Sequence, residues 1–188
     1  MTSIPTAVLG RTGLKVTRLG YGGAHRKFIE DSQRGKILNA VLDAGINYID
    51  TAGCYGNSEH LIGRYLSMRR SEFYIATKCG CVPTEDQWIR VGRKVDHYYD
   101  RKNLITGLHR SLKRLKTDHI DVMQPHNPNV DQVVDEELIN ALVKMKKQGK
   151  IRWIGISTSL PHLPTYLQWD VFDIFQLPYS AFQRDLEG

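Results

Sequence analysis

Short apolar segments of strand character alternate along this chain with amphipathic helical segments, and this alternation limits the possible folds more than any other feature. Strands are predicted for residues 17–23, 45–50, 73–77, 120–124, 151–157 and 172–176. Helices are predicted for residues 32–44, 58–66, 104–115 and 134–147, and for about eight residues after Pro161. A Gly-flanked turn between Val8 and Val16 indicates a small hairpin before the first strand. Such βαβα alternation is typical of α/β proteins with a parallel sheet.

A (β/α) barrel fits this pattern better than a Rossmann sheet, because no G-x-G-x-x-G motif follows the first strand. A complete (β/α)8 barrel has eight strands and typically about 250 residues, whereas this chain has 188 residues. We therefore predict a TIM-barrel type of fold, truncated after about six strands, in a single incomplete domain over residues 1–188. Open sheet edges expose unpaired backbone groups, so the isolated chain is expected to be unstable, to self-associate or to be the ordered part of a longer protein.

The composition excludes several classes of partner. The net charge is +6, but the basic residues are spread over several helical faces, so no nucleic-acid partner is expected. No apolar run approaches the roughly 18 residues needed to cross a membrane, and residues 1–10 do not resemble a signal peptide. Three cysteines, an odd number, do not form a disulfide framework, which indicates reduced thiols. These features predict a soluble cytoplasmic protein.

Six side chains with polar groups are predicted to meet on one face of the barrel. The carboxyl ends of all parallel barrel strands lie at the same face, where enzymes of this fold place their active sites. Five of the six lie at or just beyond the carboxyl end of a different predicted strand, and Tyr55 lies in the loop after the second strand: Asp50, Tyr55, Lys78, His126, Ser157 and Gln176. Gly22 and Gly23 end the first strand, where missing side chains would allow a ligand close to the backbone.

These residue types suggest proton transfer. A tyrosine has an unperturbed pKa near 10, and an adjacent ammonium group lowers that pKa by favouring the phenolate. Lys78 is predicted to supply this charge, and Asp50 to hold Lys78 by an ion pair. A neutral His126 would donate a hydrogen bond to a substrate oxygen and orient it.

The segment from Gly45 to Glu59, GINYIDTAGCYGNSE, resembles the signature of the aldo-keto reductases. The resemblance implies a catalytic tetrad in which Tyr55 donates a proton to a carbonyl oxygen and His126 positions the carbonyl. In this tetrad, Lys78 and Asp50 tune the acidity of Tyr55. It implies NADPH as the cofactor, which delivers hydride to the carbonyl carbon of a small aldehyde or ketone.

The resemblance also implies a nicotinamide site. Ser157 and Gln176 match the positions that hold the nicotinamide carboxamide in the family, whereas Thr158 stands where many members have asparagine. The resemblance covers nearly the whole chain but only about the first three-fifths of the family fold. In the family, the last two βα units carry the aromatic residue that stacks on the nicotinamide and the loop that binds the 2′-phosphate, so weak or absent activity is expected of this chain.

Three other interpretations were open from the sequence. The chain could be a non-catalytic reductase-like remnant or an interaction subunit, as the potassium-channel β-subunits resemble reductases while serving as partners. Alternatively, Lys78 could form a Schiff base in a lyase, although Asp50 beside it favours the unreactive ammonium. A metal site from Cys54, Cys79 and Cys81 is not predicted, because their spacing resembles no structural zinc pair.

The segment from Cys79 to Lys102 shows no sustained periodicity and is too long for an ordinary connection. We expect it to be a functional loop or locally disordered. Its aromatic and imidazole side chains are of the kind that line pockets or pack a long loop onto a barrel: Trp88, His97, Tyr98 and Tyr99.

Overall fold

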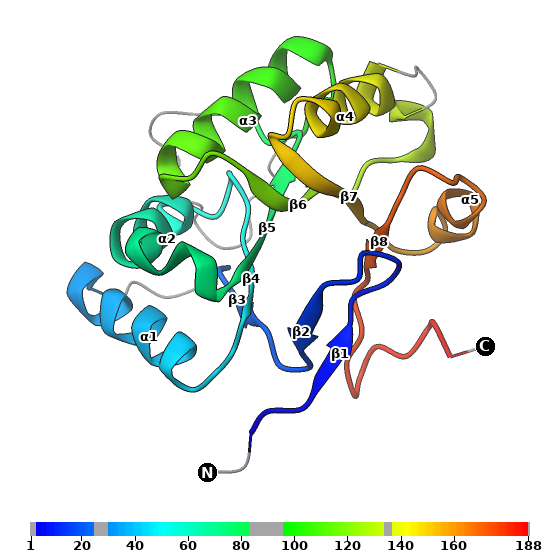
Figure 1. Cartoon of the computed structure of the whole chain (residues 1–188). Coiled ribbons are helices and arrows are strands. Elements are labelled where there is room, and N and C mark those ends of the chain that lie inside the picture. Colours follow the sequence, from blue (N-terminus) through cyan, green and yellow to red (C-terminus); the bar gives the residue numbers. More distant parts are fainter. Residues whose placement is uncertain (1–2, 25–29, 83–95, 134–136, 188) are drawn as a thin grey trace.

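The computed structural model describes residues 3–24, 30–82, 96–133 and 137–187. Six strands form one parallel sheet in sequence order, and they follow an arc with helices on its outer side (Figure 1). The strands are β3 (Tyr21–Gly22), β4 (Tyr48–Asp50), β5 (Tyr74–Cys79), β6 (Ile120–Pro125), β7 (Ile151–Ser157) and β8 (Ile174–Gln176). Within the described ranges, β3 and β8 each pair on one side only. This curled, incomplete barrel confirms the predicted fold class.

Helices connect successive strands, as the sequence predicted. They are α1 (Asp31–Asp43), α2 (Ser58–Leu66), α3 (Arg101–Leu115), α4 (Glu137–Lys147) and α5 (Leu163–Leu167). Two 3-10 helices, η1 (Ser67–Glu72) and η2 (Val130–Gln132), were not predicted. The predicted beginning of the fourth helix, residues 134–136, lies outside the described residues. Of the helices in the described part of the chain, none combines the length and apolar character that a membrane span requires.

The two faces of the sheet bury different side chains. Because side chains alternate along a strand, Ile49, Ile75 and Met123 point outward into the main core beneath the helices. Ala76 and Val122 point inward and form a smaller cluster with Ile174, against which Leu9 of the hairpin packs. The same alternation continues to the strand ends, so residues two positions further along a strand also face the inside of the arc.

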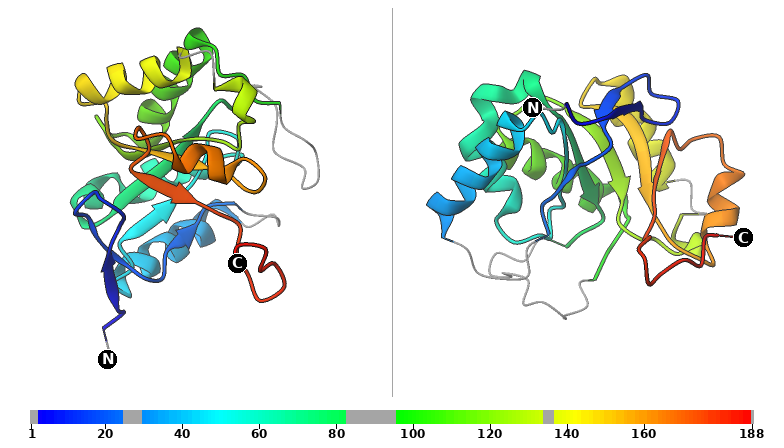
Figure 2. Two further views of the ribbon diagram at one scale, coloured as in Figure 1. Left: turned by 90° about the vertical axis from the view of Figure 1, so that its right-hand side faces the viewer. Right: turned by 90° about the horizontal axis from the view of Figure 1, so that it is seen from below.

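The N-terminal hairpin, β1 (Thr6–Val8) and β2 (Lys15–Thr17), joins distant parts of the sheet. The backbone N–H of Thr17 donates to Asn47 Oδ1 at 2.8 Å, just before β4. At the other end of the sheet, Arg11 donates to Asp173 at 3.1 Å and to the carbonyl oxygen of Phe172 at 3.1 Å, just before β8. Figure 2 shows the hairpin beside the sheet, and these contacts place it at the end where the strands begin.

A buried carboxylate connects neighbouring strands and the segment before β5. Asp121 in β6 is fully buried, and its Oδ2 accepts from the backbone N–H of Ile75 at 2.9 Å. It also binds Arg70 at 2.6 Å and Arg152 at 2.9 Å. A buried carboxylate is tolerated only when it is paired and hydrogen-bonded in this way.

We expect Asp121→Ala to lower the free energy of unfolding by about 2 kcal/mol. The substitution leaves the Ile75 N–H without its buried acceptor, while both arginines retain access to water, which limits the cost. Thermal unfolding measures the effect. Asp170→Ala removes an exposed ion pair with Arg11 and is the matched control, expected to leave the melting temperature nearly unchanged. Equal losses in the two variants would contradict this assignment.

Candidate functional site

Lys78 and Asp50 form a buried ion pair at the carboxyl ends of β5 and β4. The Lys78 ammonium donates to both Asp50 carboxylate oxygens, at 2.8 and 2.7 Å, and to the Thr51 carbonyl oxygen at 3.0 Å. The Lys78 side chain is 2% exposed. The pair predicted from the sequence is therefore present. Three acceptors and almost no exposure oppose the neutral, accessible amine that a Schiff-base lyase needs.

Gln124 in β6 joins this pair and was not predicted. Its Nε2 donates to Asp50 Oδ1 at 3.4 Å, and its Oε1 is buried without a hydrogen-bond partner among the described residues. Gln124 lies opposite Lys78 in the parallel register of β5 and β6. Its position two residues before His126, at the end of an apolar strand, is the sequence signal that would have found it.

The loop after β4 is fixed by residues at the start of α2. Thr51 Oγ1 donates to Ser58 Oγ at 2.9 Å. Glu59 is buried, accepts from Thr77 Oγ1 at 2.8 Å and lies 3.5 Å from Arg114 Nη1. The Ser-Glu pair of the signature therefore anchors the loop to the next strand and helix.

Tyr55 lies in this anchored loop, between Lys78 and His126. The Lys78 ammonium is 5.0 Å from the centre of the Tyr55 ring, and the Tyr55 and His126 rings meet edge to face at 5.8 Å. Asp50, Tyr55, Lys78 and His126, which are spread over 77 sequence positions, thus come together as predicted. 

The predicted lowering of the Tyr55 pKa is wrong. Burial raises the pKa of the Tyr55 phenol, and the negative charges of Asp50 and Cys54 raise it further. The close ion pair with Asp50 offsets the charge through which Lys78 was expected to act. Tyr55 is therefore protonated at neutral pH and can donate its proton.

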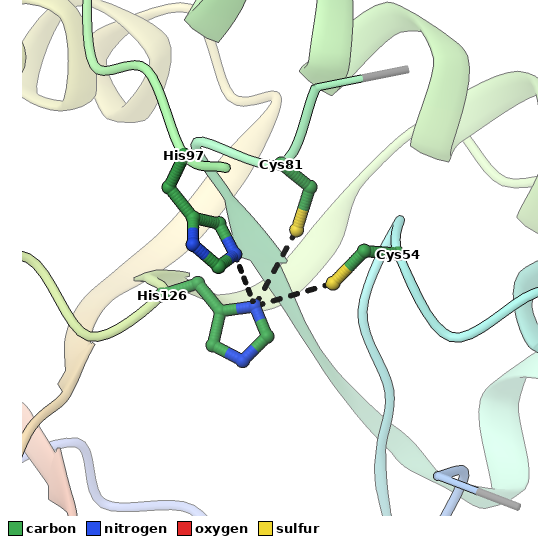
Figure 3. A group of neighbouring side chains, drawn as sticks. All are labelled: Cys54, Cys81, His97 and His126. Carbon is green, nitrogen blue, oxygen red and sulfur yellow. Dashed lines mark hydrogen bonds between the residues drawn. The ribbon is translucent and has the colours of Figure 1, made fainter. Parts of the chain in front are cut away.

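Three side chains, those of Cys54, Cys81 and His97, gather around the Nδ1 atom of His126 (Figure 3). Cys54 Sγ and Cys81 Sγ each lie 3.4 Å from this nitrogen, and His97 Nε2 lies 3.2 Å from it. A hydrogen bond from Cys81, aided by His126 and His97, lowers the pKa of the Cys54 thiol to about 3 against the effect of burial. The same bond and burial raise the pKa of Cys81. This cluster was not predicted, because its members come from three separate loops and strand ends.

The residues expected to hold a nicotinamide also meet. Ser157 and Gln176 are neighbours in the register of β7 and β8, and Ser157 Oγ donates to Asn127 Oδ1 at 2.9 Å. The Thr158 N–H donates to the Gln176 carbonyl oxygen at 3.0 Å. Thr158 Oγ1 and Gln176 Oε1 are both buried and find no hydrogen-bond partner in the described part of the chain. Two orphaned polar oxygens at neighbouring strand ends fit a ligand that carries hydrogen-bond donors, such as a carboxamide.

Gly22 and Gly23 both lie beside Asp50, but the space around the two glycines differs. A side chain at Gly23 would meet Ser58 Oγ at 2.5 Å and the Asp50 carbonyl oxygen at 3.0 Å, so the packing of the chain itself requires glycine there. Among the described residues, nothing lies within 4 Å of a Cβ placed on Gly22. Gly22 therefore leaves open space beside the site, whereas the space beside Gly23 is already occupied by Ser58 and Asp50.

Part of the long predicted loop is described. Tyr99 is buried and donates through its hydroxyl to the His126 carbonyl oxygen at 2.7 Å. It therefore packs the loop onto the site and holds the backbone of His126. Tyr98 is 57% exposed. Trp88 lies outside the described residues.

Comparison with known proteins identifies the family. The model of the aldo/keto reductase family matches residues 18–187. The L-galactose dehydrogenase of Arabidopsis thaliana is 34% identical over 174 residues, covering 86% of this chain and 50% of that protein. A probable voltage-gated potassium channel β subunit of rice is 35% identical over 187 residues, covering 96% of this chain and 51% of that protein.

Solved structures agree with this assignment. The aldo-keto reductase AKR11C1 of Bacillus halodurans, in its holo form, superposes with a TM-score of 0.83 at 31% identity, over 94% of this chain and 58% of that one. The chain thus spans about half the length of the curated relatives it matches. With a signature-bearing loop, an Asp–Lys pair at the strand ends and a matching family model, this chain belongs to the aldo-keto reductase family.

Proposed function

We propose that this chain is the nicotinamide-proximal part of an NADPH-dependent reductase of small aldehydes or ketones. The observation that carries the proposal is the convergence of Tyr55, Lys78, Asp50 and His126 at one strand-end face, beside the orphaned oxygens of Thr158 and Gln176. The chain's three cysteines are free thiols, which supports a location in the reducing cytoplasm.

The chemistry follows from the side chains. Ser157, Thr158 and Gln176 would hold the nicotinamide carboxamide, and NADPH, when bound, supplies hydride to the carbonyl carbon. His126 donates a hydrogen bond to the carbonyl oxygen and orients it, and Tyr55 transfers its phenolic proton to that oxygen. Lys78, fixed by Asp50 and the Thr51 carbonyl, balances the negative charge of Asp50 beside the phenolate that remains.

Titration of NADPH, followed by its fluorescence, tests the cofactor site. The chain is compared with a chimera that continues into the remaining barrel units of the Bacillus halodurans reductase. We expect the chimera to bind NADPH and Gln176→Ala to weaken that binding about tenfold, as loss of one hydrogen bond in a buried site does. Gln168→Ala, at an exposed position after α5, is the matched control.

The outcomes separate three cases. Binding by both proteins means that the residues described here suffice for NADPH. Binding by the chimera alone means that the chain is a half-site. If neither protein binds NADPH, or if Gln176→Ala and Gln168→Ala behave alike, the proposed nicotinamide site is wrong.

We also propose that residues 1–188 act as one incomplete barrel domain that self-associates. Within the described residues the outer sides of β3 and β8 are unpaired, and the Phe182 side chain is fully exposed. Sedimentation of the titration samples over a range of protein concentrations tests this, and a monomer at every concentration would refute it.

A second candidate function is that of a non-catalytic interaction subunit. Its support is the 35% identity to the probable potassium channel β subunit of rice. The complete set of Tyr55, Lys78, Asp50 and His126 favours the reductase. NADPH binding by the chimera without turnover of any aldehyde would favour the interaction subunit.

A further inference from the structure

Cys54, Cys81, His97 and His126 form a group of metal-ligating side chains that the reductase chemistry does not use as a group (Figure 3). One ligand atom from each side chain lies within 4.8 Å of the other three. We propose that these four side chains bind a Zn²⁺ ion through Cys54 Sγ, Cys81 Sγ, His97 Nε2 and His126 Nδ1. The site shares His126 with the proposed function but does not depend on reductase activity.

The spacing of the atoms matches a tetrahedral zinc site. Zinc lies about 2.0–2.1 Å from nitrogen and about 2.3 Å from sulfur, so tetrahedral angles place its ligand atoms about 3.3–3.8 Å apart. The measured separations from His126 Nδ1 are 3.2 Å to His97 Nε2 and 3.4 Å to each sulfur. These three separations are close to the tetrahedral values, and all four ligand atoms lie within 4.8 Å of one another.

Hydrogen bonding alone does not account for this convergence. A histidine Nδ1 carries either one proton or one in-plane lone pair, so it makes one good hydrogen bond. Three atoms lie within 3.4 Å of His126 Nδ1. A cation at the centre attracts the lone pairs of all four ligands at once, which satisfies every member of the group.

The backbone around the four side chains fixes their positions. Cys81 and His97 face each other across an antiparallel bridge, flanked by a hydrogen bond from the Tyr98 N–H to the Gly80 carbonyl oxygen at 2.8 Å. The His126 N–H donates to the Cys79 carbonyl oxygen at 3.1 Å. Tyr99 holds the His126 carbonyl, and its ring packs so closely on Gly80 that a Cβ there would lie 2.3 Å from it.

The donor set selects the metal. Two thiolates and two neutral imidazoles at tetrahedral spacing are the ligands of structural zinc sites, and the two thiolates balance the charge of the ion. Four protein ligands leave no open coordination position, which favours a structural role. The ion would connect the loop after β4, which carries Cys54, to the segments after β5 and β6.

Coordination also sets the tautomer of His126. When Nδ1 binds the ion, the ring proton is on Nε2, which in Figure 3 points away from the other three side chains. An Nε2–H is the donor that the proposed carbonyl orientation requires. The zinc site and the reductase site are therefore chemically compatible on one imidazole.

The test uses the reduced, chelator-treated protein and two ions, Zn²⁺ and Co²⁺. Zn²⁺ affinity is measured by competition with a chromophoric chelator, and Co²⁺ reports coordination through its visible spectrum. We expect one ion per chain, a strong tetrahedral Co²⁺ spectrum and a thiolate-to-cobalt charge-transfer band. Cys54→Ser and Cys81→Ser should each lower Zn²⁺ affinity by at least about 100-fold and reduce the charge-transfer band to about half.

The control variants isolate the four ligands. His97→Ala should lower affinity while both thiolate contributions to the Co²⁺ band remain. Cys79→Ala removes the third cysteine and His60→Ala an exposed histidine of α2, and both should bind as the unaltered protein does. Circular dichroism excludes unfolded variants from the comparison.

Several results would overturn the proposal. These are the absence of stoichiometric Zn²⁺ from the reduced protein, an octahedral Co²⁺ spectrum without a thiolate band, and equal losses in Cys79→Ala and Cys54→Ser. The Co²⁺ spectrum of the unaltered protein decides the matter even if a variant fails to fold. Because ion binding is measured without NADPH, failure of either proposed site leaves the other unaffected.

Discussion

Tyr55→Phe is expected to lower kcat for NADPH-dependent carbonyl reduction by about 10²–10⁴-fold, the usual contribution of a positioned general acid. The substitution removes one oxygen and leaves the ring between Lys78 and His126. NADPH affinity and melting temperature should therefore change little. The rate is measured as steady-state NADPH oxidation with 4-nitrobenzaldehyde as the test carbonyl. The assay uses whichever protein binds NADPH, the chain itself or the chimera.

Tyr65→Phe is the matched control, since Tyr65 lies in α2 against Gly35, away from the strand-end face. It should retain kcat within a factor of about two, because small changes away from the reacting atoms leave transition-state binding intact. If Tyr55→Phe kept kcat within about tenfold of the original value, the proton would come from another group, and the proposed role of Tyr55 would have to be withdrawn.

Gly63→Ala is expected to destabilise the fold by more than about 3 kcal/mol. Gly63 lies where α2 crosses α3, and a Cβ there would be 2.1 Å from the Arg114 carbonyl oxygen and 2.9 Å from the Leu115 Cα. These atoms are backbone and cannot rotate away, so the two helices must separate. That separation would also loosen the contact of Arg114 with Glu59, which anchors the loop that carries Tyr55.

Gly107→Ala in α3 provides the opposite expectation. No atom of the described residues lies within 4 Å of a Cβ at Gly107, so the added methyl group should raise stability by up to about 1 kcal/mol through helix propensity. Urea unfolding of both variants, with the slopes compared, measures the difference. Similar effects at the two positions would show that α2 and α3 do not pack as described.

The sequence located the elements whose apolar periodicity is strong. The predicted bounds of α2 and β7, residues 58–66 and 151–157, agree with the structure. The bounds of α1 were less exact: residues 32–44 were predicted, whereas the helix spans Asp31–Asp43 and its N-cap, Glu30, makes no capping side-chain bond. The first strand was predicted from residue 17 but is limited to Tyr21–Gly22. Pairing with a neighbour, rather than local propensity, sets where such a short strand begins.

The same distinction applies to the site. Asp50 and Lys78 were predictable because parallel strand ends must meet at one face. The rise in the Tyr55 pKa was not, because it depends on how deeply the loop is buried and on which charges surround it. The approach of Cys54 and Cys81 to His97 and His126 depends on loop geometry, so it leaves no spacing signal in the chain.

The hairpin has a consequence for the order of events during synthesis. Arg11 finds its acceptors at Asp170, Phe172 and Asp173, about 160 positions later in the chain. At roughly 5–20 residues per second, the hairpin must wait on the order of ten seconds or more for these acceptors to be synthesised. The apolar face of Leu9 stays uncovered during that interval. The hairpin is thus available to chaperones until the segment before β8 has been made.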